Sequence, residues 1–173
     1  MTVVLMQRTK SKITLFADGR ALRGSGTIAT NMADKIIKPN NNIIIGFCGF
    51  APDVEFLHDL TIECETAREV VDIILEAPSS LMVVEDSYLG VIVADSNLNV
   101  YEIELPSQQV SLIKENFFSF GSGADYMYGI TCTGKKQISF NEFCRAVKYL
   151  SANQDTTIGG KCTQMEVKYE KVN

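Results

Sequence analysis

Residues 2–20 of the chain read TVVLMQRTKSKITLFADGR, and this stretch decides the fold. Two apolar runs, 3–6 and 13–16, are separated by a short polar segment, which is the pattern of two strands joined by a hairpin connection. The second run ends at Asp18 and Gly19, so a carboxylate lies beside a turn-forming glycine. Once the initiator methionine is removed, the chain therefore begins directly in a strand.

Strand and helix signals follow in blocks along the rest of the chain. Short apolar runs at 35–37 and 43–48 predict a second hairpin, and helices are expected after Pro52 and after Thr66, where Glu69 completes a capping-box pattern. The later segments are strands at 88–94, 100–104, 110–113 and 117–120, a helix opened by a capping box of Ser139 and Glu142, and a strand over 161–172.

The order of these blocks favours an α+β fold in which helices lie on the outer faces of antiparallel sheets. A parallel doubly wound fold would instead alternate strands and helices strictly. The chain has 173 residues, which is enough for one domain with a sizeable core, and no linker or repeat suggests a second domain. We therefore assign residues 1–173 to a single domain.

Composition excludes several classes of function. The net charge is −5 without a basic stripe, so nucleic-acid binding is not expected. The longest apolar runs fall far short of a membrane span, and no signal-peptide cleavage site follows the first strand, so we expect neither a membrane protein nor a secreted one. The odd number of cysteines, without a Cys-x-x-Cys pair, indicates reduced thiols and a cytoplasmic location. These cysteines are Cys48, Cys64, Cys132, Cys144 and Cys162.

The sequence contains a single histidine, which limits the catalytic arrangements and metal sites that the chain could form. His58 would have to serve any Ser-His-Asp or Cys-His arrangement, yet it lies in a segment with helical spacing and is interpreted as a helix-boundary side chain. A zinc site would have to be built from carboxylates and isolated cysteines. The Gly-rich segments also lack the spacing of a phosphate-binding loop. We therefore expect no metal and no cofactor.

Thr2 is the strongest candidate for a nucleophile. A small residue after Met1 permits removal of that methionine, which leaves Thr2 with a free α-amine. The reference pKa of such an amine is about 7.7–8.0, so near neutral pH it can accept the proton of the adjacent hydroxyl. One residue would then supply both nucleophile and general base. Many chains begin with Met-Thr, so this interpretation depends on the segments that follow.

Three of those segments carry a family resemblance. In order and spacing, 16–20, 34–37 and 45–53 resemble the β-type subunits of proteasomes, most closely the bacterial HslV-type peptidase. Sixteen residues separate Thr2 from Asp18, as nucleophile and strand-end aspartate are separated in that family. The resemblance implies a four-layer αββα sandwich of two antiparallel sheets flanked by helices, the fold of N-terminal nucleophile hydrolases.

Two later segments agree with the same family. Residues 121–124 read GSGA and match its Gly-Ser-Gly turn into a helix, whereas 155–160 read DTTIGG and resemble its Asp-x-x-Ser-Gly-Gly turn. Ile158 stands where the family usually has serine, so the serine's contact with the N-terminus is missing or is supplied by Thr156 or Thr157. Cys48, Pro52 and a one-residue length adjustment before Lys35 are further departures.

The resemblance also implies roles for individual residues. Thr2 Oγ would attack a peptide carbonyl, Lys35 would lower the cost of the alkoxide, and Asp18 would fix the position of Lys35. The Gly49 N–H would face the developing oxyanion. Further positions follow from the same match: Ser122 and Asp155 would orient the N-terminus, and Ala21 and Phe47 would line the first specificity pocket.

The resemblance implies a threonine peptidase that acts on peptides or unfolded proteins. It also implies a homo-oligomer of stacked hexameric or heptameric rings, with an ATP-dependent unfoldase as partner. Two alternatives stay open. The first is a proteasome-fold subunit that has lost catalysis and serves as a scaffold, which a retained Met1 and Ile158 would favour. The second is another N-terminal amidohydrolase acting on small amides, because the same nucleophile serves acyl transfer generally.

Overall fold

The computed structural model confirms the opening hairpin and builds the first sheet around it. β1 (Val4–Arg8) and β2 (Lys12–Ala17) pair antiparallel, with Leu5 opposite Phe16. β10 (Phe117–Phe120) pairs with the other edge of β1, and β11 (Thr163–Lys168) with the other edge of β2. The structure describes residues 2–23, 26–49, 54–76, 88–131, 134 and 136–169.

The second sheet is an antiparallel meander that contains the second predicted hairpin. Its strand order follows the chain, β5-β6-β7-β8-β9, so each strand pairs with its sequence neighbour. The strands are β5 (Ile36–Ile37), β6 (Ile43–Gly49), β7 (Leu89–Asp95), β8 (Val100–Leu105) and β9 (Gln109–Leu112).

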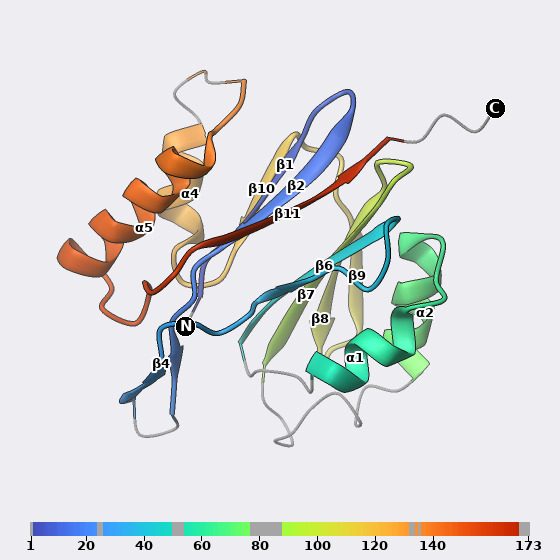
Figure 1. Cartoon of the computed structure of the whole chain (residues 1–173), viewed down its shortest axis with the longest axis horizontal. Coiled ribbons are helices and arrows are strands. Elements are labelled where there is room, and N and C mark those ends of the chain that lie inside the picture. The colour runs from blue at the N-terminus through green and yellow to red at the C-terminus, as the bar shows by residue number, and fades with distance from the viewer. Residues whose placement is uncertain are drawn as a thin grey trace.

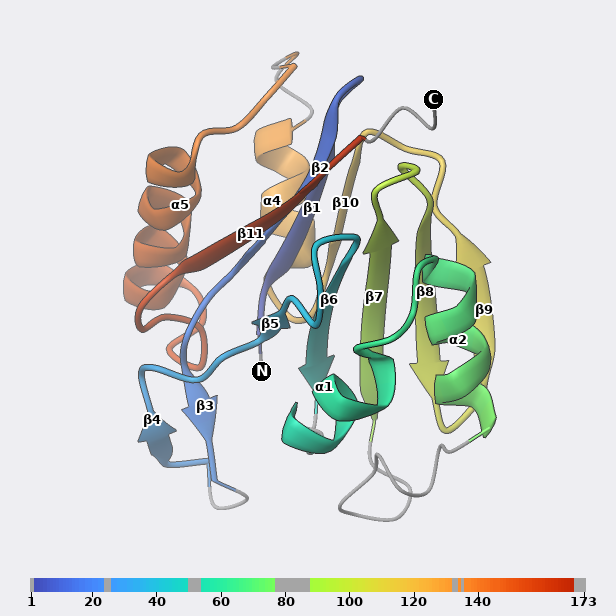
Figure 2. The same ribbon diagram turned by 45° about the vertical axis from the view of Figure 1, so that its right-hand side comes forward.

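Helices cover the outer faces of both sheets, as Figures 1 and 2 show. On the second sheet lie α1 and α2, and on the first lie α4 and α5, so the layers follow the order αββα. This arrangement confirms the predicted fold class. The helices span α1 (Val54–Thr61), α2 (Ala67–Glu76), α4 (Ala124–Thr131) and α5 (Phe140–Asn153).

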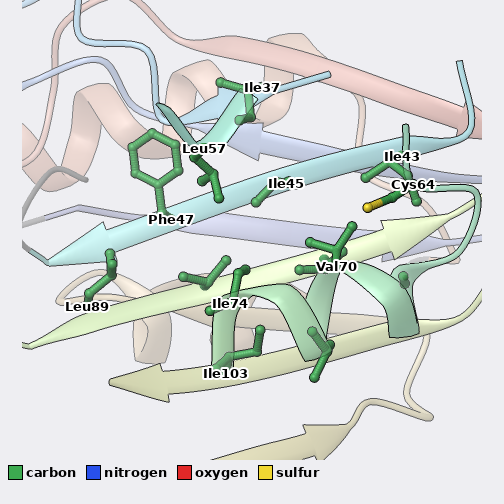
Figure 3. Close-up of a cluster of buried hydrophobic side chains, with 14 of the residues drawn as sticks. Ile37, Ile43, Ile45, Phe47, Leu57, Cys64, Val70, Ile74, Leu89 and Ile103 are labelled. Atoms are coloured by element: carbon green, nitrogen blue, oxygen red, sulfur yellow. The ribbon is translucent and has the colours of Figure 1, made fainter. Parts of the chain in front are cut away.

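The four layers enclose three apolar clusters, and this explains why the strands are nearly continuous apolar runs. Along β1, Val4 and Met6 face the space between the sheets, whereas Val3 and Leu5 pack beneath α4 and α5. Strands covered on both faces need apolar residues at successive positions. The third cluster lies between the second sheet and the helices α1 and α2 (Figure 3).

The capping patterns that predicted two of the helices are present in the structure. Ser139 and Glu142 form the predicted capping box at the start of α5, with the Ser139 hydroxyl accepting from the Glu142 N–H. The N–H of Thr66 likewise donates to the Glu69 carboxylate ahead of α2. Pro52, the predicted first residue of the preceding helix, lies outside the described residues. No helix among the described residues is long and apolar enough to cross a membrane.

Two segments differ from the sequence-based expectation. A short hairpin of β3 (Ala21–Leu22) and β4 (Ile28–Thr30) was not predicted, because both strands are very short and all three residues of β4 are exposed, so burial imposes no apolar pattern on them. The last strand begins at Thr163 rather than at Lys161, since the Lys161 N–H is bound to the Asn31 carbonyl.

Candidate active site

Asp18 is the centre of the candidate site. It lies just beyond the end of β2, is completely buried, and accepts hydrogen bonds on both carboxylate oxygens. Oδ1 accepts from Lys35 Nζ at 2.8 Å and from the Val3 N–H at 2.9 Å. Oδ2 accepts from the Gly159 N–H at 2.9 Å and from the Arg20 N–H at 3.3 Å. Such a set of donors fixes a buried carboxylate in one orientation.

Lys35 is the buried cation of the site. It lies just ahead of β5, and its carbonyl accepts from the Phe47 N–H at 3.0 Å, so the main chain holds it against β6. The side chain is almost wholly buried. Burial lowers the pKa of Lys35 from its ordinary value, and the adjacent Asp18 carboxylate opposes this effect only in part. Lys35 thus provides a desolvated ammonium beside a fixed carboxylate.

Thr2 lies next to this ion pair through the main chain. The residue after it, Val3, donates its N–H to the same Asp18 oxygen that binds Lys35 Nζ, and the Val3 carbonyl accepts from the Asp18 N–H at 3.2 Å. Thr2 itself is buried, with 4% of its surface exposed. The predicted nucleophile is therefore one peptide unit away from the group that positions Lys35. Met1, whose removal would free the Thr2 amine, lies outside the described residues.

Gly49 and Gly121 have backbone conformations and close main-chain contacts that require glycine. Gly121 has φ +91°, and a Cβ there would collide with the carbonyl oxygen of Thr2. Gly49 ends β6 with φ +97°, and a Cβ there would collide with the carbonyl oxygen of Tyr88. Both values lie in the left-handed region, which residues with a side chain rarely adopt. The main chain can therefore approach closely at both positions.

Ser122 and Asp155, which the sequence predicts to orient the N-terminus, are hydrogen-bonded to each other. The Ser122 hydroxyl donates to Asp155 Oδ2 at 2.9 Å, and both the N–H and the hydroxyl of Thr157 donate to Asp155 Oδ1. Burial raises the pKa of Asp155, but the hydrogen bonds from Thr157 and Ser122 outweigh it and hold the pKa below its ordinary value. Asp155 is thus an ionised acceptor at the turn that follows α5.

Ile158 takes part in core packing at the position where the family usually has serine. It is completely buried and lies in the cluster beneath α4 and α5 together with Val3 and Leu5. Its Cδ1 lies 2.9 Å from the point that a Cβ on Gly123 would occupy. The side chain therefore packs against the strand that follows Thr2 and has no hydrogen-bonding group to offer the N-terminus.

Replacing Ile158 by alanine is expected to lower the free energy of unfolding by about 2–4 kcal/mol, because a fully buried aliphatic side chain leaves a cavity. Chemical denaturation at a fixed oligomeric state measures the change. The matched control is Ile28→Ala on the exposed strand β4, where about 0.5 kcal/mol or less is expected. Equal losses for the two variants would contradict the packing role of Ile158.

The two predicted pocket residues differ in their surroundings. Ala21 lies on β3 and is half-exposed. Phe47 is buried in the cluster between the second sheet and α1, on the same side as Leu57 (Figure 3). Phe47 therefore contributes to the core, and only 3% of its surface is exposed.

Sequence reasoning missed two parts of the site. The Gly159 N–H was not expected to hold Asp18, and Arg20 was not expected to join distant segments. The Arg20 guanidinium donates to Asn31 Oδ1 at 2.9 Å, to Ser151 Oγ at 3.3 Å and to the Thr156 carbonyl. The only local signal was that Arg20 directly follows Asp18-Gly19. Within the described part of the chain, no group of three or more His, Cys, Asp or Glu side chains is placed to hold a metal ion.

The two antiparallel sheets between helix layers have the αββα architecture of the N-terminal nucleophile hydrolase fold. The crystal structure of eukaryotic HslV from Trypanosoma brucei is similar, with a TM-score of 0.70 and 15% sequence identity over 96% of this chain and 99% of that chain. This likeness shows the fold.

Sequence comparisons point in the same direction as the fold. The family model described as proteasome subunit matches residues 2–70, which contain Thr2, Asp18, Lys35 and Gly49. A proteasome subunit beta from Methanobrevibacter ruminantium is 28% identical over 67% of this chain, which spans 59% of the length of that relative. Together the comparisons support a proteasome β-type, HslV-like family for the chain, and they confirm the resemblance found in the sequence.

Proposed function

We propose that the protein is an N-terminal threonine peptidase that hydrolyses peptide bonds. The observation that carries this proposal is the buried Asp18 carboxylate, which binds Lys35 Nζ and the amide next to Thr2 through one oxygen. Charged side chains are costly to bury, and this buried pair lies beside the amide that directly follows Thr2. A pair needed only for packing could be replaced by apolar side chains.

In the proposed reaction, the free amine of Thr2 accepts the proton of its own hydroxyl as Oγ attacks the substrate carbonyl. The Lys35 ammonium stabilises the negative charge on Oγ, and Asp18 keeps Lys35 in place. The N–H of Gly49 donates to the oxyanion, and Ser122 and Asp155 orient the amine. The amine then protonates the leaving nitrogen, and water hydrolyses the acyl-enzyme to restore Thr2.

We further propose that the substrate is an extended peptide or unfolded protein lying between the segment after Arg20 and the end of β6, with Ala21 and Phe47 beside its side chain. An added strand would bond to the exposed main chain there. We also propose a cytoplasmic homo-oligomer of stacked hexameric or heptameric rings with a possible ATP-dependent unfoldase partner. Enclosure in a chamber would protect folded proteins from an unspecific peptidase.

The experiment that tests the function compares two forms of the same chain. One form begins at Thr2, as verified by intact mass, and the other carries a short extension ahead of Met1. Because an extended chain has no free Thr2 amine, hydrolysis of an acyl-peptide reporter is expected only from the form that begins at Thr2. Proteolytic removal of the extension together with Met1, so that the chain begins at Thr2, should restore activity. Equal activity of the two forms would rule out the terminal amine as base.

The buried Ile158 favours one alternative, a proteasome-fold subunit without catalysis that serves as a scaffold. This position packs against the core and offers no hydrogen bond to the N-terminus. A purified chain that retains Met1, forms a defined ring and hydrolyses no reporter would support the scaffold over the peptidase.

A further inference from the structure

A second site of the molecule lies on the other side of the turn that holds Asp18. A cavity of about 420 Å³ opens between α5 and the segment leading into β11. Its lining includes Cys144 and Lys148 from α5, Cys162 from the start of the last strand, and Arg20. Gly159 lines the same cavity while its N–H donates to the Asp18 carboxylate. The cavity is therefore large enough for a small ligand and is separated from the candidate active site by one turn.

Two thiols meet in this cavity. Cys144 lies in the second turn of α5 and Cys162 just ahead of β11, and both line this one cavity. Both are half-buried, in contrast to Cys48 and Cys64, which are buried in the apolar clusters. Burial, with Cys144 beside it, raises the pKa of Cys162 to about 12. Cys162 is thus a poor first nucleophile but lies in contact with its neighbour.

Positive charge lines the same cavity. Lys148 lies one helical turn beyond Cys144 on α5, and the Arg20 guanidinium is held there by its hydrogen bond to Ser151. Cations that line a cavity attract anionic reagents to it. Arg20, Lys148 and the thiols thus combine in one solvent-accessible cavity.

We propose that Cys144 and Cys162 form a redox-sensitive modification site, in which a small carboxylate-bearing disulfide such as glutathione disulfide converts the two thiols into an intramolecular disulfide. This inference is independent of the proposed peptidase activity. Disulfides in a reducing compartment are usually transient and regulatory, and a paired, accessible dithiol is the arrangement that such a role requires.

The proposed thiol–disulfide exchange takes place in two steps. The Cys144 thiolate attacks one sulfur of the small disulfide, which releases one small thiolate and leaves a mixed disulfide on Cys144. Cys162 then loses its proton and attacks the Cys144 sulfur, which releases the second small thiolate. The two cysteine sulfurs are oxidised, the small disulfide is reduced to two thiols, and those thiols take up the two protons.

The new bond would join α5 to the turn that positions Asp18. Cys162 follows Gly159 by three residues, and Gly159 donates to Asp18 Oδ2. The intervening Lys161 N–H is bound to the Asn31 carbonyl at 2.7 Å, so the segment is already held on one side. Closing a short loop also restricts the unfolded chain. The oxidised protein is therefore expected to unfold at a Tm higher by roughly 5 °C or more.

The test incubates the reduced full chain in buffers of increasing glutathione disulfide to glutathione ratio and maps the cysteine-containing peptides by mass. The expected product is a single cross-linked pair of peptides containing Cys144 and Cys162, formed while Cys48 and Cys64 remain thiols. Lys148→Gln should slow the reaction several-fold with glutathione disulfide but not with uncharged hydroxyethyl disulfide, because only the former carries carboxylates.

Three single substitutions of cysteines make the outcome decisive. Cys64→Ser should leave the cross-link and the rise in Tm intact, whereas Cys144→Ser and Cys162→Ser should each abolish both. A mixed disulfide that persists on Cys144 with Cys162 present would overturn the intramolecular pair. Oxidation of the pair only after denaturation, or a cross-link to another cysteine, would overturn the site itself.

Discussion

Replacing Thr2 by alanine is expected to abolish hydrolysis of acyl-peptide reporters, with a fall in kcat/KM on the order of 10³-fold or more. The substitution removes the hydroxyl that would attack the carbonyl and leaves the terminal amine, the Lys35–Asp18 pair and the Gly49 amide in place. The measurement is steady-state hydrolysis by protein whose Met1 removal has been verified by intact mass. Thr2→Ser keeps a hydroxyl at the same atom and should retain measurable turnover.

The controls for this prediction separate chemistry from folding. Thr2→Ala also removes a buried methyl group, so the oligomeric state should be kept and the unfolding midpoint should fall only modestly. Thr9→Ala, in the connection between β1 and β2, changes the same functional group at the far end of β1 and should leave turnover unchanged. Hydrolysis that survives Thr2→Ala would eliminate the threonine mechanism altogether.

Much of the fold can be predicted from the sequence because its signals are local. The opening hairpin follows from two apolar runs and a polar connection, and the start of α5 follows from the Ser139 and Glu142 capping box. These elements depend on neighbours a few residues away. The β3–β4 hairpin escaped prediction because it is short and exposed, so burial imposes no pattern on it.

The candidate site was only partly accessible to sequence reasoning. Thr2, Asp18 and Lys35 were placed together by family resemblance, and the structure brings Asp18 and Lys35 to 2.8 Å. The hydrogen bond from Gly159 to Asp18 joins residues 141 positions apart, and no local pattern encodes such a pairing. The packing role of Ile158 could not be predicted either. An apolar residue in a polar turn has no local partner, and only the structure shows that it lies in the same buried cluster as Val3.

Replacing Asp18 by alanine is expected to have the largest effect on stability, a loss of about 3–5 kcal/mol in the free energy of unfolding. The substitution leaves the buried Lys35 ammonium without its counter-ion and removes the acceptor for the N–H groups of Val3 and Gly159. Uncompensated buried charge and unpaired amides are each costly. Chemical denaturation measures the loss, and reporter hydrolysis should disappear at the same time.

The ion pair between Lys12 and Glu166 provides the surface control for this prediction. It joins β2 to β11 at 2.5 Å, but both side chains are more than a third exposed, so Lys12→Ala is expected to cost about 1 kcal/mol or less. If Asp18→Ala and Lys12→Ala lower the free energy of unfolding by similar amounts, the buried ion pair stabilises the fold no more than the surface pair does.

A double substitution separates the two consequences of losing Asp18. In Asp18→Ala/Lys35→Met the unpaired ammonium is replaced by an apolar side chain of similar length, so a large part of the lost stability should return, although the amides of Val3 and Gly159 stay without their acceptor. Hydrolysis should not return, because no cation then faces Thr2 Oγ. Recovery of activity together with stability would mean that the ion pair serves folding alone. If Lys35→Met restores no stability, the loss in the free energy of unfolding comes mainly from the unpaired amides and not from the buried charge.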